Sequence, residues 1–562
     1  MAFRTLSTFP SLPHGLTKSN PKPTVIFRKP IAKIVCKSVT PSGSPLQVTV
    51  SEPDSDGTGA AAPTPGERFL ERQRAHESAR TVMRELKKEE KKKKKKENPR
   101  KVVTSVACCY GCGAPLQTCE ADSPGYVDPG TYELKKKHHQ LRTVICGRCK
   151  LLSHGHMITA VGGNGGYPGG KQFISADELR EKLSHLRHEK AFIVKLVDIV
   201  DFNGSFLSHV RDLVGANPIT LVVTKVDLLP RGTDMNCVGD WVVELTTKKK
   251  LNVLSVHLTS SKSLAGISGV ASEIQKEKKG RDVYILGAAN VGKSAFINAL
   301  LKTMAERDPA AAAAQKYKPI QSAVPGTTLG PIQIDAFLGG GKLYDTPGVH
   351  LHHRQAAVVH SDDLPALAPQ SRLRGQSFHI STLSSPSSYI PEAKCLEGYT
   401  FFWGGLVRVD VLKVLPETCL TFYGPKALQI HAIPTEKADG FYHKEVGVLL
   451  TPPSGKQKTE EWKGLESRHL LRIKFGDTER PASDVAISGL GWISIEPIRR
   501  TTGSEPRHLE DEEREICLAI SVPKPVEVFV RPPLPVGTAG AGWYQYRELT
   551  DKEEETRPRW YF

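Results

Sequence analysis

The stretch that decides the fold, residues 287–294, reads Gly287-Ala288-Ala289-Asn290-Val291-Gly292-Lys293-Ser294. It matches the pattern GxxxxGK(S/T), in which glycines let backbone N–H groups wrap phosphates, the lysine reaches the β- and γ-phosphates and the hydroxyl binds Mg²⁺. The flanks fit, because residues 282–286 form an apolar run typical of a strand and residues 294–301 are typical of a helix, whose N-terminus attracts anions. The sequence therefore predicts a phosphate loop that contacts a nucleotide through Gly287, Asn290, Val291, Gly292, Lys293 and Ser294.

Two motifs downstream fit the magnesium and γ-phosphate side of the same site. Asp345-Thr346-Pro347-Gly348 follows the apolar residues 342–344, where a carboxylate can hold Mg²⁺ through water and the Gly348 N–H can sense the γ-phosphate. Pro325-Gly326-Thr327-Thr328 fits a mobile switch whose Thr328 hydroxyl completes the magnesium shell in the triphosphate state. We predict that the catalytic residues are Lys293, Thr328 and Gly348 and that the magnesium ligands are Ser294, Thr328 and Asp345.

Two motifs upstream fit the recognition of guanine. Thr224-Lys225-Val226-Asp227 follows the apolar run 221–223, and the Asp227 carboxylate can accept hydrogen bonds from guanine N1–H and the 2-amino group, a pair that adenine does not offer. The stem of Lys225 can lie over the base, whereas Thr224 replaces the more usual Asn and weakens one contact. Ser260-Ser261-Lys262 follows a second apolar run and resembles a loop that contacts guanine O6. The predicted base-recognition residues are Thr224, Lys225, Asp227, Ser260, Ser261 and Lys262.

Paired cysteines predict a metal site. Cys109-Tyr110-Gly111-Cys112 and Cys146-Gly147-Arg148-Cys149 are two CxxC pairs, and four thiolates in this spacing favour a structural tetrahedral Zn²⁺. Cys108 and Cys119 lie nearby, His154 or His156 is an alternative ligand, and redox-active or unliganded cysteines are the alternative interpretation. The basic residues 135–139 and Arg142 lie between the pairs and favour contact of this module with RNA. The predicted zinc ligands are Cys109, Cys112, Cys146 and Cys149.

Composition and hydropathy outline the rest of the chain. Residues 1–50 contain no Asp or Glu but many Ser, Pro and basic residues, which is typical of a transit peptide and favours the chloroplast stroma over the mitochondrion. No apolar run is long enough to span a membrane, and the net charge of +17 favours a polyanionic partner, RNA first.

Asp308-Pro309 and the alanines 310–314 suggest a long flexible insertion, and from about residue 375 short strands without a convincing long helix predict a mainly β domain.

The order of the motifs points to a family. Apolar runs at 192–197, 219–223, 251–258, 282–286 and 342–344 alternate with helical stretches, which predicts an α/β fold with a mainly parallel sheet. Along the chain the motifs run TKVD, SSK, GAANVGKS, PGTT and DTPG, so base recognition precedes the phosphate loop, and the order resembles that of circularly permuted GTPases. With CYGCGAPLQ and CGRC upstream, the chain resembles the YqeH-type GTPases, strongly over 105–350.

This resemblance implies a GTPase that binds GTP or GDP with Mg²⁺ and acts on ribosomal RNA and the precursor of the small subunit of a bacterial-type ribosome. It further implies a potassium ion at Asn290, and a slow intrinsic rate because Val349 stands where other GTPases carry a catalytic Gln. It also implies that the switch leads into the C-terminal domain, so the nucleotide state can tilt that domain. The predicted segments are a transit peptide at 1–50, a disordered linker and Lys-rich arm at 51–101, a zinc-binding module at 102–170, a circularly permuted GTPase domain at 171–370 and a β-rich RNA- or protein-binding domain at 371–562.

Two alternatives belong to other functional classes. One is an RNA-binding scaffold that senses nucleotide with negligible turnover. The other is a redox enzyme, such as one that makes nitric oxide, which needs haem, flavin and nicotinamide sites. The sequence has no GxGxxG between a strand and a helix and no cysteine that stands out as a haem ligand, so the redox alternative is the weaker one.

Overall fold

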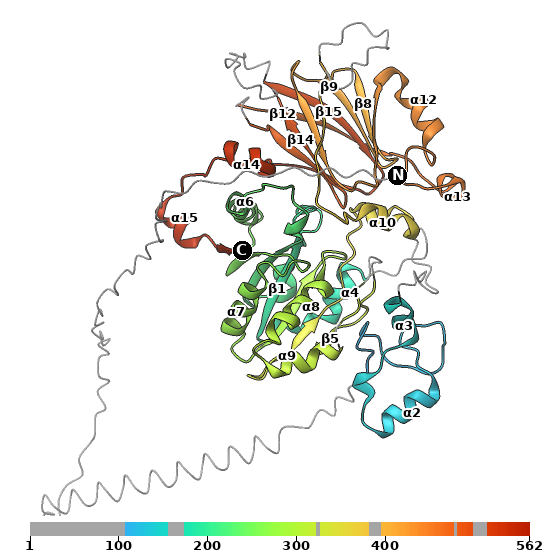
Figure 1. Cartoon of the computed structure of the whole chain (residues 1–562), viewed down its shortest axis with the longest axis vertical. Helices are drawn as coiled ribbons and strands as arrows, with labels where there is room; N and C mark the ends of the chain where they lie inside the picture. Colours follow the sequence, from blue (N-terminus) through green and yellow to red (C-terminus); the bar gives the residue numbers. More distant parts are fainter. Residues whose placement is uncertain are drawn as a thin grey trace, which may run out of the picture. The chain divides into compact units, whose positions relative to one another are not determined.

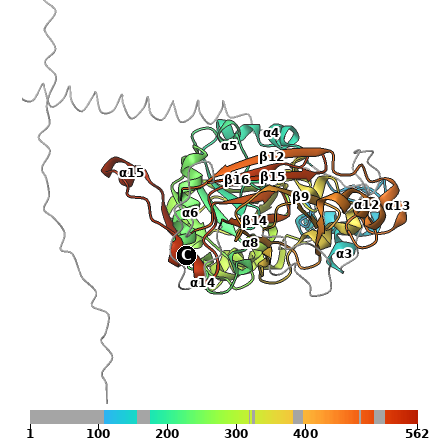
Figure 2. The ribbon, with the colours of Figure 1, turned by 90° about the horizontal axis from the view of Figure 1, so that it is seen from above.

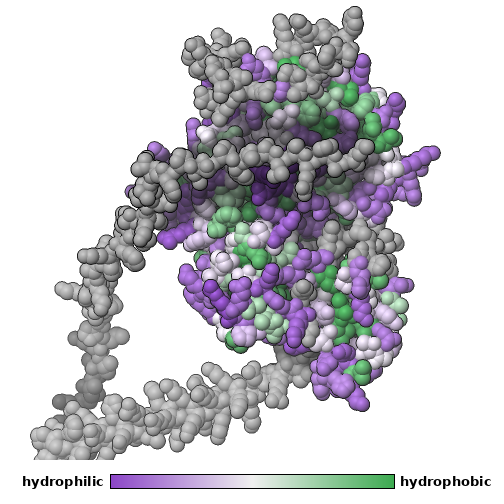
Figure 3. All heavy atoms as spheres, viewed as in Figure 1, coloured by the Kyte–Doolittle hydropathy of each residue, from purple (hydrophilic) through white to green (hydrophobic). Residues whose placement is uncertain are grey.

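The computed structural model describes residues 107–154, 174–317, 319–321, 326–380, 395–476, 480–497 and 514–562. The predicted transit peptide and Lys-rich arm, the start of the zinc module, His156 and Pro325 lie outside these residues. Among the described residues, no helix is both long enough and apolar enough to cross a membrane. On the face shown in Figure 3, hydrophobic residues occur in small groups among hydrophilic ones.

A seven-stranded sheet forms the centre of the nucleotide-binding part, in the order β17-β3-β2-β1-β4-β6-β5. All neighbouring strands run parallel except β5 and β6. Every residue of β1 and β2 is buried, as expected for strands of a parallel sheet that is covered on both faces. The strands are β1 Ala191–Asp198, β2 Ile219–Thr224, β3 Ser255–Leu258, β4 Asp282–Gly287, β5 Ile332–Ile334, β6 Leu343–Asp345 and β17 Arg559–Tyr561.

The sheet order confirms the α/β fold with permuted motifs. Strand β4, which leads into the phosphate loop, lies between β1 from earlier in the chain and β6 from later in the chain. TKVD follows β2, SSK follows β3 and DTPG starts at the end of β6, so all these loops emerge from the carboxyl ends of parallel strands. Ligands bind at this edge of open α/β sheets. The predicted strand 251–258 is shorter than expected, because the strand begins only at Ser255.

Alternate side chains of β1 point into two different cores. Ile193 and Val197 pack in the same cluster as Trp241 of α6, whereas Val194 packs with Phe296 of α8 on the opposite face. Helices α7 and α8 can be followed beside the sheet in Figure 1. The helices of this part are α4 Ala176–Lys182, α5 Val210–Val214, α6 Met235–Lys248, α7 Ile267–Lys278, α8 Lys293–Met304, α9 Pro309–Ala314 and α10 Leu364–Leu367.

The expectation of a flexible insertion at the alanine run is wrong. These residues form α9, whose first residue is Pro309 and whose N-cap is Asp308, with the carboxylate accepting from the Ala310 N–H at 2.9 Å. Ala311 and Ala314 are buried against the same core as α8. An acidic N-cap followed by proline is a strong start signal, and alanine has the highest helix propensity, so local chemistry together with this packing stabilises the helix.

The C-terminal part consists mainly of two five-stranded antiparallel sheets, as predicted. Their orders are β16-β13-β14-β10-β7 and β11-β8-β9-β15-β12, and Phe401 and Leu518 of one sheet share a core with Phe422 and Ile493 of the other. The strands are β7 Gln376–Phe378, β8 Tyr399–Trp403, β9 Val407–Lys413, β10 Cys419–Tyr423, β11 Ile430–Pro434, β12 Ser467–Lys474, β13 Ser483–Ile487, β14 Gly491–Glu496, β15 Glu515–Val522 and β16 Val528–Arg531.

No convincing long helix was expected in this part, and the longest one among its described residues has 11 residues. Helix α12, Thr435–Glu445, packs Ala438 into a small core with Phe402 and Leu450. Ala438 is its single buried residue, so the helix has no apolar stripe by which a sequence pattern could identify it. The remaining helices are short: α13 Lys456–Glu460, α14 Gly537–Trp543 and α15 Asp551–Thr556.

The sheet that contains β13, β14 and β16 contacts the nucleotide-binding part through a buried arginine. The Arg531 guanidinium lies 5.1 Å from the ring of Trp241 in α6 and 5.3 Å from the ring of Trp492 in β14. Its Nη2 lies 3.5 Å from the buried Asp484 carboxylate. The Trp241 Nε1 of α6 also donates to the carbonyl of Pro532, directly after β16, at 3.2 Å. Figure 2 gives a second view of these elements. A buried arginine packed against two tryptophan rings is a specific contact, so the two parts meet at an interface and are not joined only by a linker.

Residues 559–561 form an edge strand of the nucleotide-binding sheet, which the sequence analysis did not predict. Strand β17 pairs with β3, Trp560 lies against Gly239 of α6, and the Tyr561 ring stacks on His257 with centroids 5.0 Å apart. Trp560 Nε1 also donates to the Asp240 carboxylate at 3.3 Å. Because β3 leads into SSK, the last strand covers the edge of the sheet beside the predicted base-recognition loop.

Candidate functional site

The phosphate loop joins β4 to α8, as its sequence predicts. Asn290 and Gly292 have φ of 61° and 92°, left-handed values that allow the loop to turn before Lys293 begins the helix. A Cβ on Gly287 would lie 2.9 Å from Val291 Cγ2, so the loop packs too closely there for a side chain. These features give the loop the backbone path that wraps a phosphate.

Lys293 is buried at the centre of this loop. Its Nζ donates to the carbonyl oxygens of Gly287 at 3.2 Å and Ala288 at 2.9 Å. Burial lowers the pKa of Lys293 to about 8, while the nearby Asp345 carboxylate opposes this effect. Phosphate oxygens are stronger acceptors for an ammonium group than these carbonyls, so the arrangement is suited to an anionic ligand.

Ser294 and Asp345 converge beside Lys293. Ser294 Oγ donates to Asp345 Oδ2 at 3.3 Å, and the Asp345 side chain is fully buried. Burial raises the pKa of Asp345 to about 6, opposed by the charge of Lys293 and by the Ser294 hydrogen bond. Asp345 Oδ1 is a buried acceptor with no hydrogen-bond partner among the residues that the structure describes. A buried oxygen of this kind needs a ligand, and a hard oxygen-coordinated cation such as Mg²⁺, directly or through water, fits these residues.

The DTPG segment lies directly on the phosphate loop. A Cβ on Gly348 would lie 2.8 Å from Lys293 Nζ and 2.9 Å from Ala289 Cα, so only glycine fits here. The Ala289 N–H donates to the carbonyl of Val349 at 2.8 Å, and the Val349 N–H donates to that of Gly287 at 3.3 Å. Gly348 therefore lies beside the lysine that is predicted to hold the γ-phosphate.

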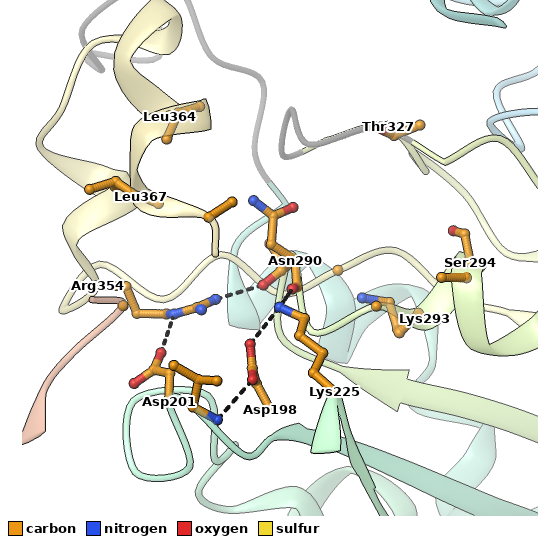
Figure 4. A pocket seen from close by; sticks show the side chains of 18 of the residues that line it. Asp198, Asp201, Lys225, Asn290, Lys293, Ser294, Thr327, Arg354, Leu364 and Leu367 are labelled. Carbon is orange, nitrogen blue, oxygen red and sulfur yellow. Dashed lines mark hydrogen bonds and ion pairs between the residues drawn. The ribbon is translucent and has the colours of Figure 1, made fainter. Parts of the chain in front are cut away.

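The TKVD loop is tied to the phosphate loop through its first two residues. Thr224 Oγ1 donates to the Val291 carbonyl at 2.7 Å, a contact that sequence analysis did not predict for this residue. Lys225 has a left-handed φ of 64°, and its Nζ donates to the Asn290 carbonyl at 2.9 Å and to Asp198 Oδ2 at 2.5 Å (Figure 4). These contacts hold the predicted base-recognition loop TKVD against the phosphate loop.

The remaining base-recognition residues lie on two loops that touch. Asp227 is half-buried in the 3-10 turn Val226–Leu228, and the Val226 N–H donates to the Thr259 carbonyl at 3.2 Å. Ser260 is buried and its Oγ accepts from the Ser263 N–H at 3.1 Å, whereas Ser261 is half-buried and Lys262 is exposed. The structure thus brings TKVD and SSK together, as the permuted order requires.

A cavity of about 540 Å³ lies over the phosphate loop, within the usual size of a ligand pocket. Its lining includes Asn290, Lys293, Ser294, Gly348 and both threonines of the switch, Thr327 and Thr328. Asp227 and the SSK residues are not part of the lining. Lys225 of TKVD does line it, so the cavity lies over the phosphate loop and reaches the first of the two predicted base-recognition loops.

Sequence analysis missed three charged residues in this cavity: Asp198, Asp201 and Arg354. The buried Arg354 places Nε 2.9 Å from Asp201 Oδ2 and donates from Nη1 to the phosphate-loop carbonyl of Ala289 at 2.6 Å (Figure 4). Burial raises the pKa of Asp201, opposed by Arg354, and the Asp201 carboxylate accepts from the backbone N–H of Gly489 in the β13–β14 turn. Asp198 is the last residue of the fully buried strand β1 and Asp201 follows it closely, which was an available signal, whereas Arg354 follows no local pattern.

The four predicted cysteine ligands form one buried cluster. Their sulfur atoms all lie within 4.8 Å of one another, and the Sγ atoms of Cys112 and Cys146 are 3.9 Å apart. Four thiolates about 2.3 Å from a tetrahedral zinc lie about 3.8 Å apart, so the cluster fits Zn²⁺. Cys109 Sγ accepts from the N–H groups of Gly111 and Cys146 at 3.4 and 3.2 Å. Hydrogen bonding with the Cys112 thiol is the main cause that lowers the pKa of Cys109 to about 7.

The neighbouring candidate ligands lie outside this cluster. Cys108, Cys119 and His154 are exposed and do not belong to it. The cysteine pairs are joined by α2, Pro129–Lys137, and a 3-10 turn at Leu141–Thr143, and the second pair opens α3, Gly147–Ser153.

We expect Cys112→Ala to remove one zinc per chain, because three buried thiols without the fourth lose the closed tetrahedral shell that a structural site needs. Elemental analysis of the purified chain measures this directly. The matched control is Cys119→Ala, which changes an exposed cysteine of the same module and should keep the metal. Equal metal content in both variants would contradict the assignment.

Comparison with known proteins agrees with this geometry. Residues 282–370 match the family model described as 50S ribosome-binding GTPase, and residues 417–534 match the one described as YqeH-like, C-terminal. The chain is 77% identical to NO-associated protein 1, chloroplastic/mitochondrial, of Arabidopsis thaliana over the full length of both. It is 66% identical to an Oryza sativa subsp. japonica protein over 92% of this chain and 93% of the relative. It is 32% identical to YqeH of Bacillus subtilis over 75% of this chain and 98% of the relative. The chain therefore belongs to the YqeH-like family of GTPases.

Proposed function

We propose that the chain hydrolyses GTP to GDP and phosphate and uses this cycle in assembly of the small subunit of a bacterial-type ribosome, and so in chloroplast translation and development. The observation that carries the proposal is the convergence of Lys293, Ser294 and the buried, unpartnered Asp345 oxygen at the phosphate loop. The Arabidopsis relative is named as chloroplastic/mitochondrial, which supports the predicted import of this chain.

The residues at the site suggest how the reaction is assisted. In this proposal Lys293 and the loop N–H groups hold the β- and γ-phosphates, and Gly348 donates its N–H beside the γ-phosphate. Ser294, Thr328 and Asp345 would hold Mg²⁺, which when bound neutralises charge on the phosphates. Asp227 would accept from guanine, with Ser260, Ser261 and Lys262 near its O6 edge. Because this set offers no general base, catalysis rests on positioning and electrostatics.

Val349 supports the slow intrinsic rate in this proposal. Its side chain is apolar and buried, and its backbone is hydrogen-bonded to the phosphate loop on both sides. It therefore offers no polar group to orient the attacking water. We infer that an effector raises the rate, with the ribosomal precursor as the first candidate.

Potassium is expected to stimulate turnover through Asn290. Its backbone turns through the left-handed region at the cavity wall, and its amide oxygen is a suitable ligand for a monovalent cation. Turnover measured in K⁺ and in Na⁺ should differ, and Asn290→Ala should lose the difference, a change of about tenfold or about 1.4 kcal/mol. The exposed-site control Asn252→Ala should keep it. A potassium response that survives in Asn290→Ala would refute this assignment.

The zinc module carries the basic surface that we propose contacts ribosomal RNA. Lys136, Lys137, His138, His139 and Arg142 are exposed, and α2 buries none of its residues. The chain as a whole has a net charge of +17. Phosphate contacts from such residues give binding that weakens steeply with salt.

We expect Lys136→Glu with Lys137→Glu to weaken binding to small-subunit precursors from an organelle extract and to flatten its salt dependence. The control is Lys276→Glu with Lys279→Glu, which reverses two exposed lysines around α7. RNA crosslinking and co-sedimentation measure both the partner and the affinity. The matched family model is described as a 50S ribosome-binding GTPase, so large-subunit RNA is the competing outcome. Preferential recovery of large-subunit RNA would overturn the small-subunit part of the proposal.

Nitric oxide enters this proposal only indirectly. The rice relative is named as a nitric oxide synthase and the Arabidopsis one as NO-associated. This sequence has no GxGxxG motif for a flavin or nicotinamide cofactor, whereas its cavity is built around a phosphate loop. We propose that any effect on nitric oxide follows from organelle translation, and visible absorbance of bound haem or flavin in the pure protein would contradict this.

A further inference from the structure

The zinc module is hydrogen-bonded to the segment that carries Thr328 and packs closely against it. The carbonyl of Cys112 accepts from the N–H groups of Leu329 at 2.7 Å and Gly330 at 3.2 Å. A Cβ on Gly330 would lie 2.5 Å from the Gly113 carbonyl oxygen, so the two backbones are packed together without room for a side chain. The first cysteine knuckle, residues 109–113, therefore holds the chain immediately after Thr328.

Arg148 holds the same segment on the other side of Thr328. This residue lies between the cysteines of the second pair, and its guanidinium donates from Nη2 to the Gly326 carbonyl at 3.0 Å and from Nη1 to the Thr327 carbonyl at 3.4 Å. A planar guanidinium can bridge two successive carbonyls in a way that a lysine cannot. Thr328 is thus bracketed by hydrogen bonds to both cysteine pairs.

Apolar contacts reinforce these hydrogen bonds. Leu329 and Ile320 both pack against the cysteine cluster, and a Cβ on Gly111 would lie 2.9 Å from Ile320 Cδ1. Lys182 of α4 donates to the Leu329 carbonyl at 3.1 Å. The segment is therefore seated between the zinc module and the nucleotide-binding part, with Thr327 and Thr328 lining the cavity.

We infer that Arg148 and the first cysteine knuckle position Thr328. In this arrangement the zinc module holds the switch segment where Thr328 can serve Mg²⁺ and the γ-phosphate. This inference rests on the proposed function, because it assumes that Thr328 serves the triphosphate state. The first pair reaches the neighbours of Thr328 through the main-chain carbonyl of Cys112, and the second pair reaches them through the Arg148 side chain. A metal that held the four cysteines would therefore also hold the backbone on both sides of Thr328. Binding is reciprocal, so GTP would also hold the zinc module, and with it the basic helix α2, in one position.

The test compares triphosphate with diphosphate affinity. We expect Arg148→Ala to lower the ratio of GTPγS affinity to GDP affinity about tenfold while GDP affinity and zinc content stay unchanged, because two hydrogen bonds to the switch are lost and no cysteine is touched. Arg148→Lys should recover part of the ratio. The matched control is Lys150→Ala, which changes an exposed cationic residue on α3, the helix that also carries Arg148, and should leave the ratio unchanged.

A second variant approaches the contact from the switch side. In Gly330→Ala the new Cβ meets the Gly113 carbonyl and separates the switch from the knuckle without altering the zinc module. Gly330→Ala should lower the ratio of GTPγS affinity to GDP affinity as Arg148→Ala does, with full zinc content. Backbone hydrogen exchange of residues 326–330 should become faster in Arg148→Ala and in Gly330→Ala. If Arg148→Ala loses zinc, the affinity ratio of Gly330→Ala alone tests whether the contact between the knuckle and the switch positions Thr328.

A double-mutant cycle separates positioning from general stability. Arg148→Ala should have little further effect on turnover in a Thr328→Ala background, because both act on the same interaction. The inference is overturned if the two losses multiply, or if Arg148→Ala and Gly330→Ala keep the affinity ratio of the unsubstituted chain. If the unsubstituted chain itself neither binds nor hydrolyses GTP, the proposed function fails instead, and the two failures are distinguishable.

Discussion

Asp227→Ala should remove the preference of the protein for GTP over ATP. In the proposed site the Asp227 carboxylate accepts two hydrogen bonds from guanine, one from N1–H and one from the 2-amino group, and each bond to a charged acceptor contributes about 1.5–3 kcal/mol. Removing both should reduce selectivity by about two orders of magnitude or more. Competition between GTP and ATP for the purified chain in magnesium buffer measures the ratio.

The same residue allows a change of specificity in addition to a loss. Asp227→Asn replaces one acceptor with an amide N–H donor, which mismatches guanine but suits xanthine, whose position 2 is a carbonyl. We therefore expect Asp227→Asn to prefer XTP over GTP. Asp212→Ala, at an exposed carboxylate on α5, is the control and should retain GTP selectivity. If Asp227→Ala still selects GTP over ATP, the assignment of TKVD to the base is wrong.

Lys293→Ala should reduce GTP hydrolysis by about 10²–10³-fold, the usual effect of removing a preorganised charge from a developing anion. Burial already lowers the pKa of this ammonium group to about 8, so the charge is held at an energetic cost that bound phosphate would offset. For the same reason the free protein should not lose thermal stability in Lys293→Ala. What should disappear is the rise in melting temperature that GTP causes.

Lys302→Ala is the matched control for this prediction, because Lys302 lies exposed on the same helix α8. It should keep both turnover and stabilisation by GTP. A Lys293→Ala protein that unfolds without nucleotide would point to a structural role for the lysine. One that turns over GTP at the original rate would show that the phosphate loop has been assigned to the wrong chemistry.

Local sequence signals predicted the α/β sheet and the cysteine cluster. The turn at 287–294, the buried strands beside it and the cysteine cluster all depend on short spacings that leave a pattern, and the structure confirms the α/β sheet and the four-cysteine cluster. The alanine run was misinterpreted although Asp308 and Pro309 carry a local start signal. The roles of all the predicted nucleotide-, magnesium- and potassium-binding residues, Lys293 and Asp345 included, remain predictions.

Contacts between distant segments left no local pattern. Arg354 reaches Asp201 and the phosphate loop, the Gln355 N–H donates to the Ser488 carbonyl of the β13–β14 turn at 2.9 Å, and β17 returns from the end of the chain to β3. These interactions are created by tertiary packing, and single residues such as Arg354 have no spacing by which they could be recognised. They also give a physical basis for the expectation that nucleotide state reaches the C-terminal sheets, since Arg354 and Gln355 are adjacent in the segment after DTPG.

The most direct test of the central claim is the nucleotide bound by the purified full-length chain, measured by titration calorimetry with GTP, GDP and ATP in buffer with Mg²⁺ and K⁺. We predict that GTP and GDP each bind with a stoichiometry of one per chain, and that excess ATP does not prevent this binding. A folded, zinc-loaded protein that binds neither GTP nor GDP would contradict the account at its foundation.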